Sequence, residues 1–299
     1  MQKMARSRPG IIVALAAACF LGLYAAGASG SRKVAATAEA VAASSEALPA
    51  TGGLPDSGTE DGDAGAGAAP GNTPTADEIL DRVDENLTFD TRSARVTMIV
   101  EGRRTRTYEM QSFVRGVTDA AVEYRSPPRE RGTRMLKLGD RLWMYMPRID
   151  RVQQISGHML REGMMGSDVS YEDLMESPKL REMYEAELVG REELDGRPTW
   201  KLEMTARDEG VTYPRRTTWI DKETYIPLKQ ELYTADGMLL KTWTMSEIEA
   251  FGEGRKFPTR MTVEDHVIED SITRLKFDDM EFGIELEDEI FSLRWVERR

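Results

Sequence analysis

The sequence predicts a mainly β domain of the α+β type, built on a curved antiparallel sheet of about ten or eleven strands. Turn-forming pairs such as Gly139-Asp140 and Asp195-Gly196 separate runs rich in Thr, Val, Tyr, Trp and Leu, which is typical of strands joined by hairpins. One helix with a single apolar face precedes these runs, and one methionine-rich segment interrupts them. Because strand twist accumulates, a sheet of this size curls and leaves one concave face.

The first 28 residues predict a secretion signal. Lys3, Arg6 and Arg8 precede an uncharged apolar run from Ile11 to Ala26, which is shorter than the roughly 20 residues that cross a bilayer comfortably. Ala26-Gly27-Ala28 supplies small residues for cleavage before residue 29. We therefore expect a protein released into the periplasm, with an uncleaved anchor as a less favoured alternative.

The chain has one cysteine, Cys19, and it lies inside the apolar run. Cleavage after Ala28 would leave the mature domain without a disulfide or a thiol nucleophile. The residues before Cys19 loosely resemble a lipoprotein box, so a lipid anchor on Cys19 is an alternative. The position of Leu15 and the bulky Phe20 argue against it.

Residues 29–74 predict a flexible linker, because they are mostly Ala, Gly, Ser, Thr and Pro and include almost no large apolar side chain. The remaining residues, 75–299, form one predicted domain. The whole chain carries a net charge of −12, which argues against general nucleic-acid binding.

The domain begins with a predicted helix that runs to about Asn86. Thr75 and Glu78 have the spacing of a capping box. Ile79, Leu80, Val83 and Leu87 then fall on one face, which needs a sheet to cover it.

Strands follow this helix, and alternation predicts which side chains share a face. Ala94, Val96, Met98 and Val100 lie on one side of the first strand, and Tyr108, Met110, Ser112 and Val114 on one side of the second. Further turns are predicted at Asp236-Gly237 and Gly252-Glu253-Gly254. Arg103, Arg104 and Arg106 lie on a hairpin, where they predict an exposed edge that charge protects from pairing.

The segment from Ser156 to Ser177 predicts a mobile lid. Alternation ends at Ile155, and methionines then cluster between glycines, which suits an adaptable apolar cover. A short helix from Tyr171 to Met175 is predicted, with Ser170 or Asp168 as its cap. The lid residues are Met159, Leu160, Met164, Met165, Asp168, Tyr171, Leu174 and Met175; the polar ones among them, with Glu172 and Asp173, are expected to hold the lid in place more than to touch a ligand.

From about residue 75 to its end the chain resembles the outer-membrane lipoprotein-sorting protein family of LolA-like carriers. The resemblance rests on Tyr145, Pro147, Val152, Ile155-Ser156, Met165-Gly166-Ser167-Asp168, Ser170-Tyr171-Glu172-Asp173-Leu174 and Ile290-Phe291-Ser292-Leu293-Arg294-Trp295-Val296-Glu297-Arg298. It implies a LolA/LolB-like half-barrel with helices across the concave side and a hydrophobic cavity for acyl chains, in a carrier that is not an enzyme. Family members do not share one ligand.

Methionines and tryptophans on successive strands are the candidates for lining that cavity. An alternative is that each is ordinary core beneath the helices. The candidates are Met98, Met110, Leu142, Met144, Met146, Trp200, Leu202, Met204, Trp243, Met245, Met261 and Val263.

A second, weaker candidate site is a basic rim that could meet phospholipid headgroups or an acidic transporter domain. A solvated surface paired with scattered carboxylates explains the same residues equally well. The rim consists of Arg125, Arg129, Arg131, Arg134, Arg141, Arg148 and Arg151, with Lys137 among them.

The sequence contains few residues or motifs that indicate an enzyme. His158 and His266 are the two histidines, and no nucleophile elbow, metalloprotease helix or phosphate-binding loop is present. We therefore expect no catalytic residue, no metal site, no cofactor and no enzymatic activity.

The leading hypothesis is a periplasmic carrier or chaperone that shields acyl chains of lipoproteins or lipids and transfers them toward the outer membrane. Its expected partners are an inner-membrane transporter and an outer-membrane acceptor, and we expect a monomer. The alternative is a non-transporting interaction module, such as an accessory domain of a membrane exporter or an envelope sensor.

Overall fold

The structure is a computed structural model that describes residues 73–87, 89–176, 179–268 and 270–298. The predicted signal peptide at 1–28 and nearly all of the predicted linker at 29–74 lie outside these ranges. None of the helices within them has the length and apolar character needed to pass through a membrane.

The domain begins with helix α1 (Ala76–Asn86), as predicted. Thr75 caps it, and the Thr75 and Glu78 side chains bond each other's backbone N–H groups in a capping box. Ile79, Leu80 and Val83 are fully buried against the sheet, so the apolar face drives this helix onto the strands.

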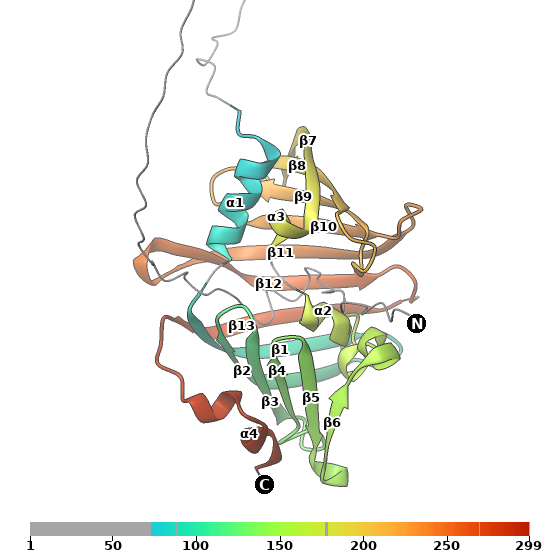
Figure 1. Cartoon of the computed structure of the whole chain (residues 1–299), viewed down its shortest axis with the longest axis vertical. Coiled ribbons are helices and arrows are strands. Elements are labelled where there is room, and N and C mark those ends of the chain that lie inside the picture. The colour runs from blue at the N-terminus through green and yellow to red at the C-terminus, as the bar shows by residue number, and fades with distance from the viewer. Residues whose placement is uncertain (1–72, 88, 177–178, 269, 299) are drawn as a thin grey trace, which may run out of the picture. The chain divides into compact units, whose positions relative to one another are not determined.

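Within the described ranges, thirteen strands form a single antiparallel sheet, slightly more than predicted (Figure 1). Several turns lack the glycine pairs that signal a hairpin. Between β9 and β10, for example, Asp221 Oδ1 accepts hydrogen bonds from the backbone of Glu223 and Thr224 and shapes the turn instead. The strands are β1 (Thr91–Glu101), β2 (Arg106–Arg115), β3 (Asp119–Ser126), β4 (Arg134–Leu138), β5 (Arg141–Met146), β6 (Arg151–Ile155), β7 (Tyr184–Leu194), β8 (Arg197–Ala206), β9 (Arg215–Asp221), β10 (Pro227–Tyr233), β11 (Leu239–Phe251), β12 (Arg255–Asp265) and β13 (Ile272–Phe282).

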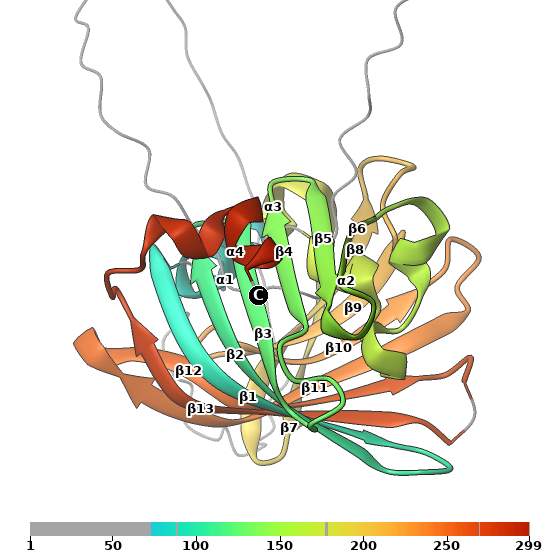
Figure 2. The same ribbon diagram turned by 90° about the horizontal axis from the view of Figure 1, so that it is seen from below.

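Strand order follows chain order almost everywhere. It runs β6-β5-β4-β3-β2-β1-β13-β12-β11-β10-β9-β8-β7, so the first and last strands pair in the middle of the sheet. The consecutive strands β6 and β7 are the two edges. The segment that joins them holds the short helices η3 (Gly157–Arg161), η4 (Met164–Gly166), α2 (Tyr171–Met175) and α3 (Leu180–Met183), and the curved sheet bends around it (Figure 2).

Two apolar clusters cover the two faces of the sheet. The larger lies on the inner face, which we define as the face covered by α1, α2 and α3. The smaller lies on the outer face of β3 to β5, where Phe291, Trp295 and Val296 pack against Ala121, Leu136 and Tyr145. These C-terminal residues come from η6 (Asp288–Phe291) and α4 (Leu293–Glu297). Two further short helices of the described residues, η2 (Pro147–Ile149) and η5 (Gly252–Gly254), lie in turns.

Candidate functional site

The predicted cavity residues share one surface, the inner face of the sheet. All twelve belong to or pack against the larger apolar cluster, and all except the half-buried Met146 are buried. Cross-strand pairing explains this, because Trp243 lies opposite Val263 and Met245 opposite Met261. The structure therefore brings together side chains that extend across the whole half-barrel.

The predicted lid lies directly on this face. Met164, Tyr171 and Leu174 are buried in the same cluster, and Met159, Leu160, Met165 and Met175 are half-buried against it. Lid and strand side chains thus fill the inner face in this closed arrangement. An open cavity at this place stays a prediction.

The Met165-Gly166-Ser167-Asp168 motif forms a tight loop that fastens the lid to the sheet. The guanidinium of Arg106, on β2, donates to Met165 O at 2.9 Å and to Gly166 O at 2.8 Å. Asp168 exchanges hydrogen bonds with Thr273 of β13: its N–H donates to Thr273 Oγ1 at 2.9 Å, and its Oδ2 accepts from that hydroxyl at 2.6 Å. The motif therefore attaches the lid to the sheet.

Glycines make this loop possible. A Cβ at Gly163 would lie 2.1 Å from Ser167 O, which the backbone could not accommodate. Gly166 has a φ of +72°, and a Cβ there would lie 2.9 Å from a guanidinium nitrogen of Arg106. Both positions need glycine for the lid to reach Arg106.

Helix α2 has the predicted bounds, Tyr171–Met175, and Ser170 is its cap. Asp173 completes a capping box with Ser170. Asp168, the other candidate cap, binds β13 instead.

Asp173 also anchors α2 to the sheet through a buried polar contact. Its carboxylate accepts hydrogen bonds from Lys241 Nζ and from the hydroxyl of Tyr213, both at 2.6 Å. The Asp173 side chain is fully buried and that of Lys241 is 9 % exposed. Removing one partner of such a pair leaves an uncompensated buried charge, so this contact secures the lid to β11.

A second pair of charges lies beside the first. Glu176, which ends α2, approaches Arg216 of β9 with 3.6 Å between carboxylate oxygen and guanidinium nitrogen, and the two side chains are 1 % and 0 % exposed. Neither carboxylate oxygen of Glu176 has a hydrogen-bond partner. Burial raises the pKa of Glu176 well above its usual value, and the positive charge of Arg216 only partly opposes this effect.

Comparison with known proteins decides the family. A family profile described only as that of an uncharacterized protein matches residues 116–298. An outer-membrane lipoprotein-sorting protein domain from Vibrio parahaemolyticus is 26% identical with a TM-score of 0.65, covering 73% of this chain and 98% of that one. A LolA superfamily protein from Nitrosomonas europaea is also 26% identical, with a TM-score of 0.62, covering 75% of this chain and all of that one.

The chain belongs to the family of this profile, and its fold is that of LolA-like outer-membrane lipoprotein-sorting domains. A DUF1329 family protein from Desulfovibrio piger shares the fold, with a TM-score of 0.69 at 23% identity, covering 74% of this chain and 97% of that chain. No curated protein matches the chain.

Three arginines of the predicted basic rim of this LolA-like domain lie beside carboxylates. Arg125 lies 2.8 Å from Glu123, Arg129 3.5 Å from Glu130, and Arg141 4.0 Å from Asp140. Arg131 donates to the backbone oxygen of Arg125, while Arg148 and Arg151 are exposed.

Two predictions about arginines need correction. Arg134 does not line an exposed rim, because it is half-buried and donates to Trp295 O at 3.0 Å, which holds α4 on the outer face. Arg103, Arg104 and Arg106 do not protect an edge, because β1 and β2 lie in the middle of the sheet. Arg106 instead fastens the lid.

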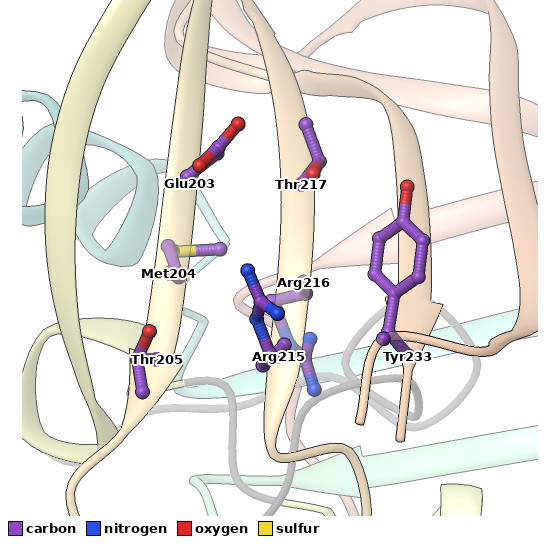
Figure 3. Close-up of a pocket in the computed structure, with 8 residues that line it drawn as sticks. Glu203, Met204, Thr205, Arg215, Arg216, Thr217 and Tyr233 are labelled. Atoms are coloured by element: carbon purple, nitrogen blue, oxygen red, sulfur yellow. The ribbon is translucent and has the colours of Figure 1, made fainter. Parts of the chain in front are cut away.

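Two hollows of the LolA-like domain open at its surface, one beside the lid and one on the outer face. One, of about 540 Å³, adjoins the lid at Met165 and is lined by Arg106, Tyr108, Pro127, Arg129 and other residues. The other, of about 200 Å³, is polar and lies between the exposed Glu203, Thr205 and Arg215 on the face of β8 and β9 opposite the core (Figure 3). The first gives solvent access to the lid loop.

Metal ligands do not gather anywhere in the ranges that the structure describes: no group of three or more His, Cys, Asp or Glu side chains is placed to hold an ion. His266 Nε2 lies 2.8 Å from Thr242 Oγ1, and His158 is exposed.

The buried polar contacts of the lid were missed by sequence reasoning. Lys241 alternates with Trp243 and Met245, so the pattern that placed these two on the inner face also places Lys241 there. Arg216 precedes the buried Thr218 and Ile220 in the same way. The sequence does carry a signal for these contacts: a Lys or Arg occupies a strand position that alternates with residues of the inner face.

Proposed function

We propose that this LolA-like domain carries acyl chains of lipoproteins or lipids on the inner face of its sheet after the lid moves away. The observation that carries the proposal is a continuous apolar face, rich in Met and Trp, whose cover is a separate segment fastened at a few polar points. Methionine adapts to chains of variable shape. Each buried methylene contributes about 0.8 kcal/mol, so a chain of roughly ten carbons could offset several lid contacts.

The predicted secretion signal and the family together support a periplasmic location for this carrier. We propose that it receives its cargo from an inner-membrane transporter and delivers it to an outer-membrane acceptor. Carriage of this kind involves no bond making or breaking, and no cofactor enters the proposal.

A disulfide that locks the lid tests the proposal. Asp168 and Thr273 touch through their side chains, so cysteines at both positions, in a Cys19→Ser background, would join lid and sheet. We expect the oxidised D168C/T273C protein to lose binding of a fluorescent fatty acid and to regain it on reduction. The single variants D168C and T273C control for the lost hydrogen bonds. Equal binding by the oxidised and reduced forms would contradict lid-gated carriage.

A non-transporting interaction module is the second candidate, and one observation favours it: lid and strand side chains fill the inner face. Such a module would bind no acyl probe in either redox state. Native mass spectrometry of protein from an envelope fraction separates the two candidates, because a carrier retains lipid and an interaction module does not.

A further inference from the structure

The inner face holds a group of buried charges where an acyl-binding surface would be apolar. Three of them are cations on strands: Lys137 on β4, Arg216 on β9 and Lys241 on β11, none more than 7 % exposed as a whole residue. Two lid carboxylates, Asp173 and Glu176, lie beside Arg216 and Lys241, whereas the third buried carboxylate of the lid, Asp168, binds Thr273 instead. The strands therefore provide more positive charge here than the lid neutralises.

Arg216 is poorly satisfied by the lid. Its guanidinium stays protonated inside proteins, yet Nε and Nη2 have no hydrogen-bond partner and are buried. Glu176 lies 3.6 Å away, beyond the range of a hydrogen bond. Nη1 donates to Gln230 Oε1 at 3.3 Å, and the guanidinium carbon lies 4.6 Å from the centre of the Tyr184 ring. Arg216 thus keeps two donors for an anionic oxygen.

Arg216 and Lys241 lie in one row across the sheet. Leu232 of β10 pairs with Arg216 on one side and with Lys241 on the other. In the next row, the Oγ1 of Thr218 and the Nε1 of Trp243 are also buried without a hydrogen-bond partner. Polar groups that could meet a ligand therefore border the apolar side chains of the same strands.

The two lid carboxylates would leave this site together. Asp173 lies within α2 and Glu176 ends it, so displacement of α2 removes both anions from the face. Arg216 and Lys241 would then lose their anionic partners on a face whose other side chains are mostly apolar, which is unfavourable. An incoming anion that replaces the carboxylates removes this obstacle.

We propose that Arg216 and Lys241 form a site for the anionic headgroup, carboxylate or phosphate, of an acyl amphiphile, and that Asp173 and Glu176 occupy this site while the lid is closed. The inference rests on the proposed acyl-chain binding and adds the chemical class of the ligand. The acyl chain would lie along the neighbouring Leu202, Trp243 and Met245.

Lys137 supports the same ligand class. Burial lowers the pKa of Lys137 to about 8, and the nearby charge of Glu176 opposes this effect. An anion bound in place of Glu176 would meet a third cation from the opposite half of the sheet.

Paired ligands that differ only in the headgroup test the proposal. Sodium oleate and oleyl alcohol share a chain, and calorimetric titration of the full protein measures the affinity for each. We expect oleate to bind about 10-fold more tightly or better, since an ionised carboxylate accepts stronger hydrogen bonds than a hydroxyl. We expect Arg216→Gln to bind the two ligands nearly equally, while Arg216→Lys, which keeps the charge, retains most of the preference. Equal affinities in the unmodified protein would overturn the headgroup site.

The source of the anion is a separate arm of the experiment. Oleoyl lysophosphatidic acid presents a phosphate on an acyl chain, whereas inorganic phosphate has no chain. We expect the lipid to bind and inorganic phosphate alone to bind far more weakly. Binding of inorganic phosphate as tightly as the lipid would contradict an amphiphile site.

A measurement on the unmodified protein keeps the test decisive if Arg216 variants fail to fold. The carboxyl carbon of ¹³C-labelled oleate reports its own ionisation by NMR. Contact with Arg216 and Lys241 would hold the carboxyl pKa of bound oleate below that of free oleate, whereas a purely apolar site would raise it. A raised value overturns the proposal. If oleyl alcohol binds as tightly as oleate, the headgroup site is rejected but acyl carriage is not. If neither ligand binds, both the headgroup site and acyl carriage are rejected.

Discussion

At the scale of single residues, the lid is held by polar side chains buried among apolar ones. Asp168, Asp173 and Glu176 each face a different strand of the inner face. Buried polar contacts contribute little net stability when complete but cost much when one partner is lost. They therefore fix one closed position of the lid more than they strengthen the fold.

Asp84 provides a prediction at this scale. It lies on the buried side of α1, and burial raises its pKa from 3.8 to about 7, opposed by hydrogen bonds from the backbone of Arg181 and Leu180. Between about pH 4 and 7 the folded state holds a proton that the unfolded state has released, so stability falls as the pH rises through this window.

We expect Asp84→Asn to remove that pH dependence. At pH 8 the variant should be more stable than the unmodified protein by about 1 kcal/mol or more, and at pH 4 the two should differ little. Urea unfolding at the two pH values measures this difference. Asp81→Asn, on the exposed side of α1, is the control, and an equal gain from both variants would contradict the assignment to Asp84.

At the scale of elements, the lid loop depends on one arginine of β2. Arg106 makes two hydrogen bonds to backbone oxygens of η4, and both atoms belong to the loop that Gly163 and Gly166 permit. Removing the guanidinium should weaken lid closure while leaving the sheet intact.

We expect Arg106→Ala to shift the lid toward opening by about 1–3 kcal/mol. Hydrogen exchange of amides in residues 164–170 should accelerate, and exchange in β11 and β12 should not change. Arg103→Ala, an exposed arginine of the same hairpin, serves as the matched control. Unchanged exchange in the loop would show that other contacts hold it closed.

At the scale of the whole molecule, two half-sheets meet along one seam. Strands β1 to β6 and β7 to β13 each form by pairing of neighbours in the chain, and the β1–β13 pairing joins them. Leu275 of β13 lies opposite Met98 of β1 and is buried at this seam.

We expect Leu275→Ala to destabilise both halves together by about 2–5 kcal/mol. Native-state hydrogen exchange should show the same loss for slow amides in β4 and in β9. Lys276→Ala, an exposed neighbour on the same strand, should have little effect. A loss confined to β9 would mean that the halves unfold independently.

Local patterns in the sequence were sufficient for the helix and for the strand faces. The capping box at Thr75 and Glu78 and the alternation through Met98 and Met110 depend on near neighbours in the chain, and the structure confirms them. The capping residue of α2 was narrowed to two candidates for the same reason.

Contacts between the lid and the sheet could not be predicted, because they join distant residues. Asp168 and Thr273 lie 105 positions apart, and their meeting depends on the curvature of the sheet and on the β1–β13 pairing. Arg106 was predicted to lie at a sheet edge, because no local sequence pattern indicates that the first and last strands pair with each other. The additional strands were not predicted, because turns shaped by side chains, such as the one at Asp221, lack the glycine pairs that signal a hairpin.

The pairing of β1 with β13 can form only when synthesis of the chain is nearly complete. A ribosome releases β1 early and β13 almost last, so the two partners of the central pairing are separated by nearly the entire time of translation. Each half can assemble from hairpins as it emerges, but until β13 arrives the two half-sheets have no strand pairing between them. A polypeptide that ends before β13 would therefore expose two unpaired strand borders, β1 and β12, to other chains.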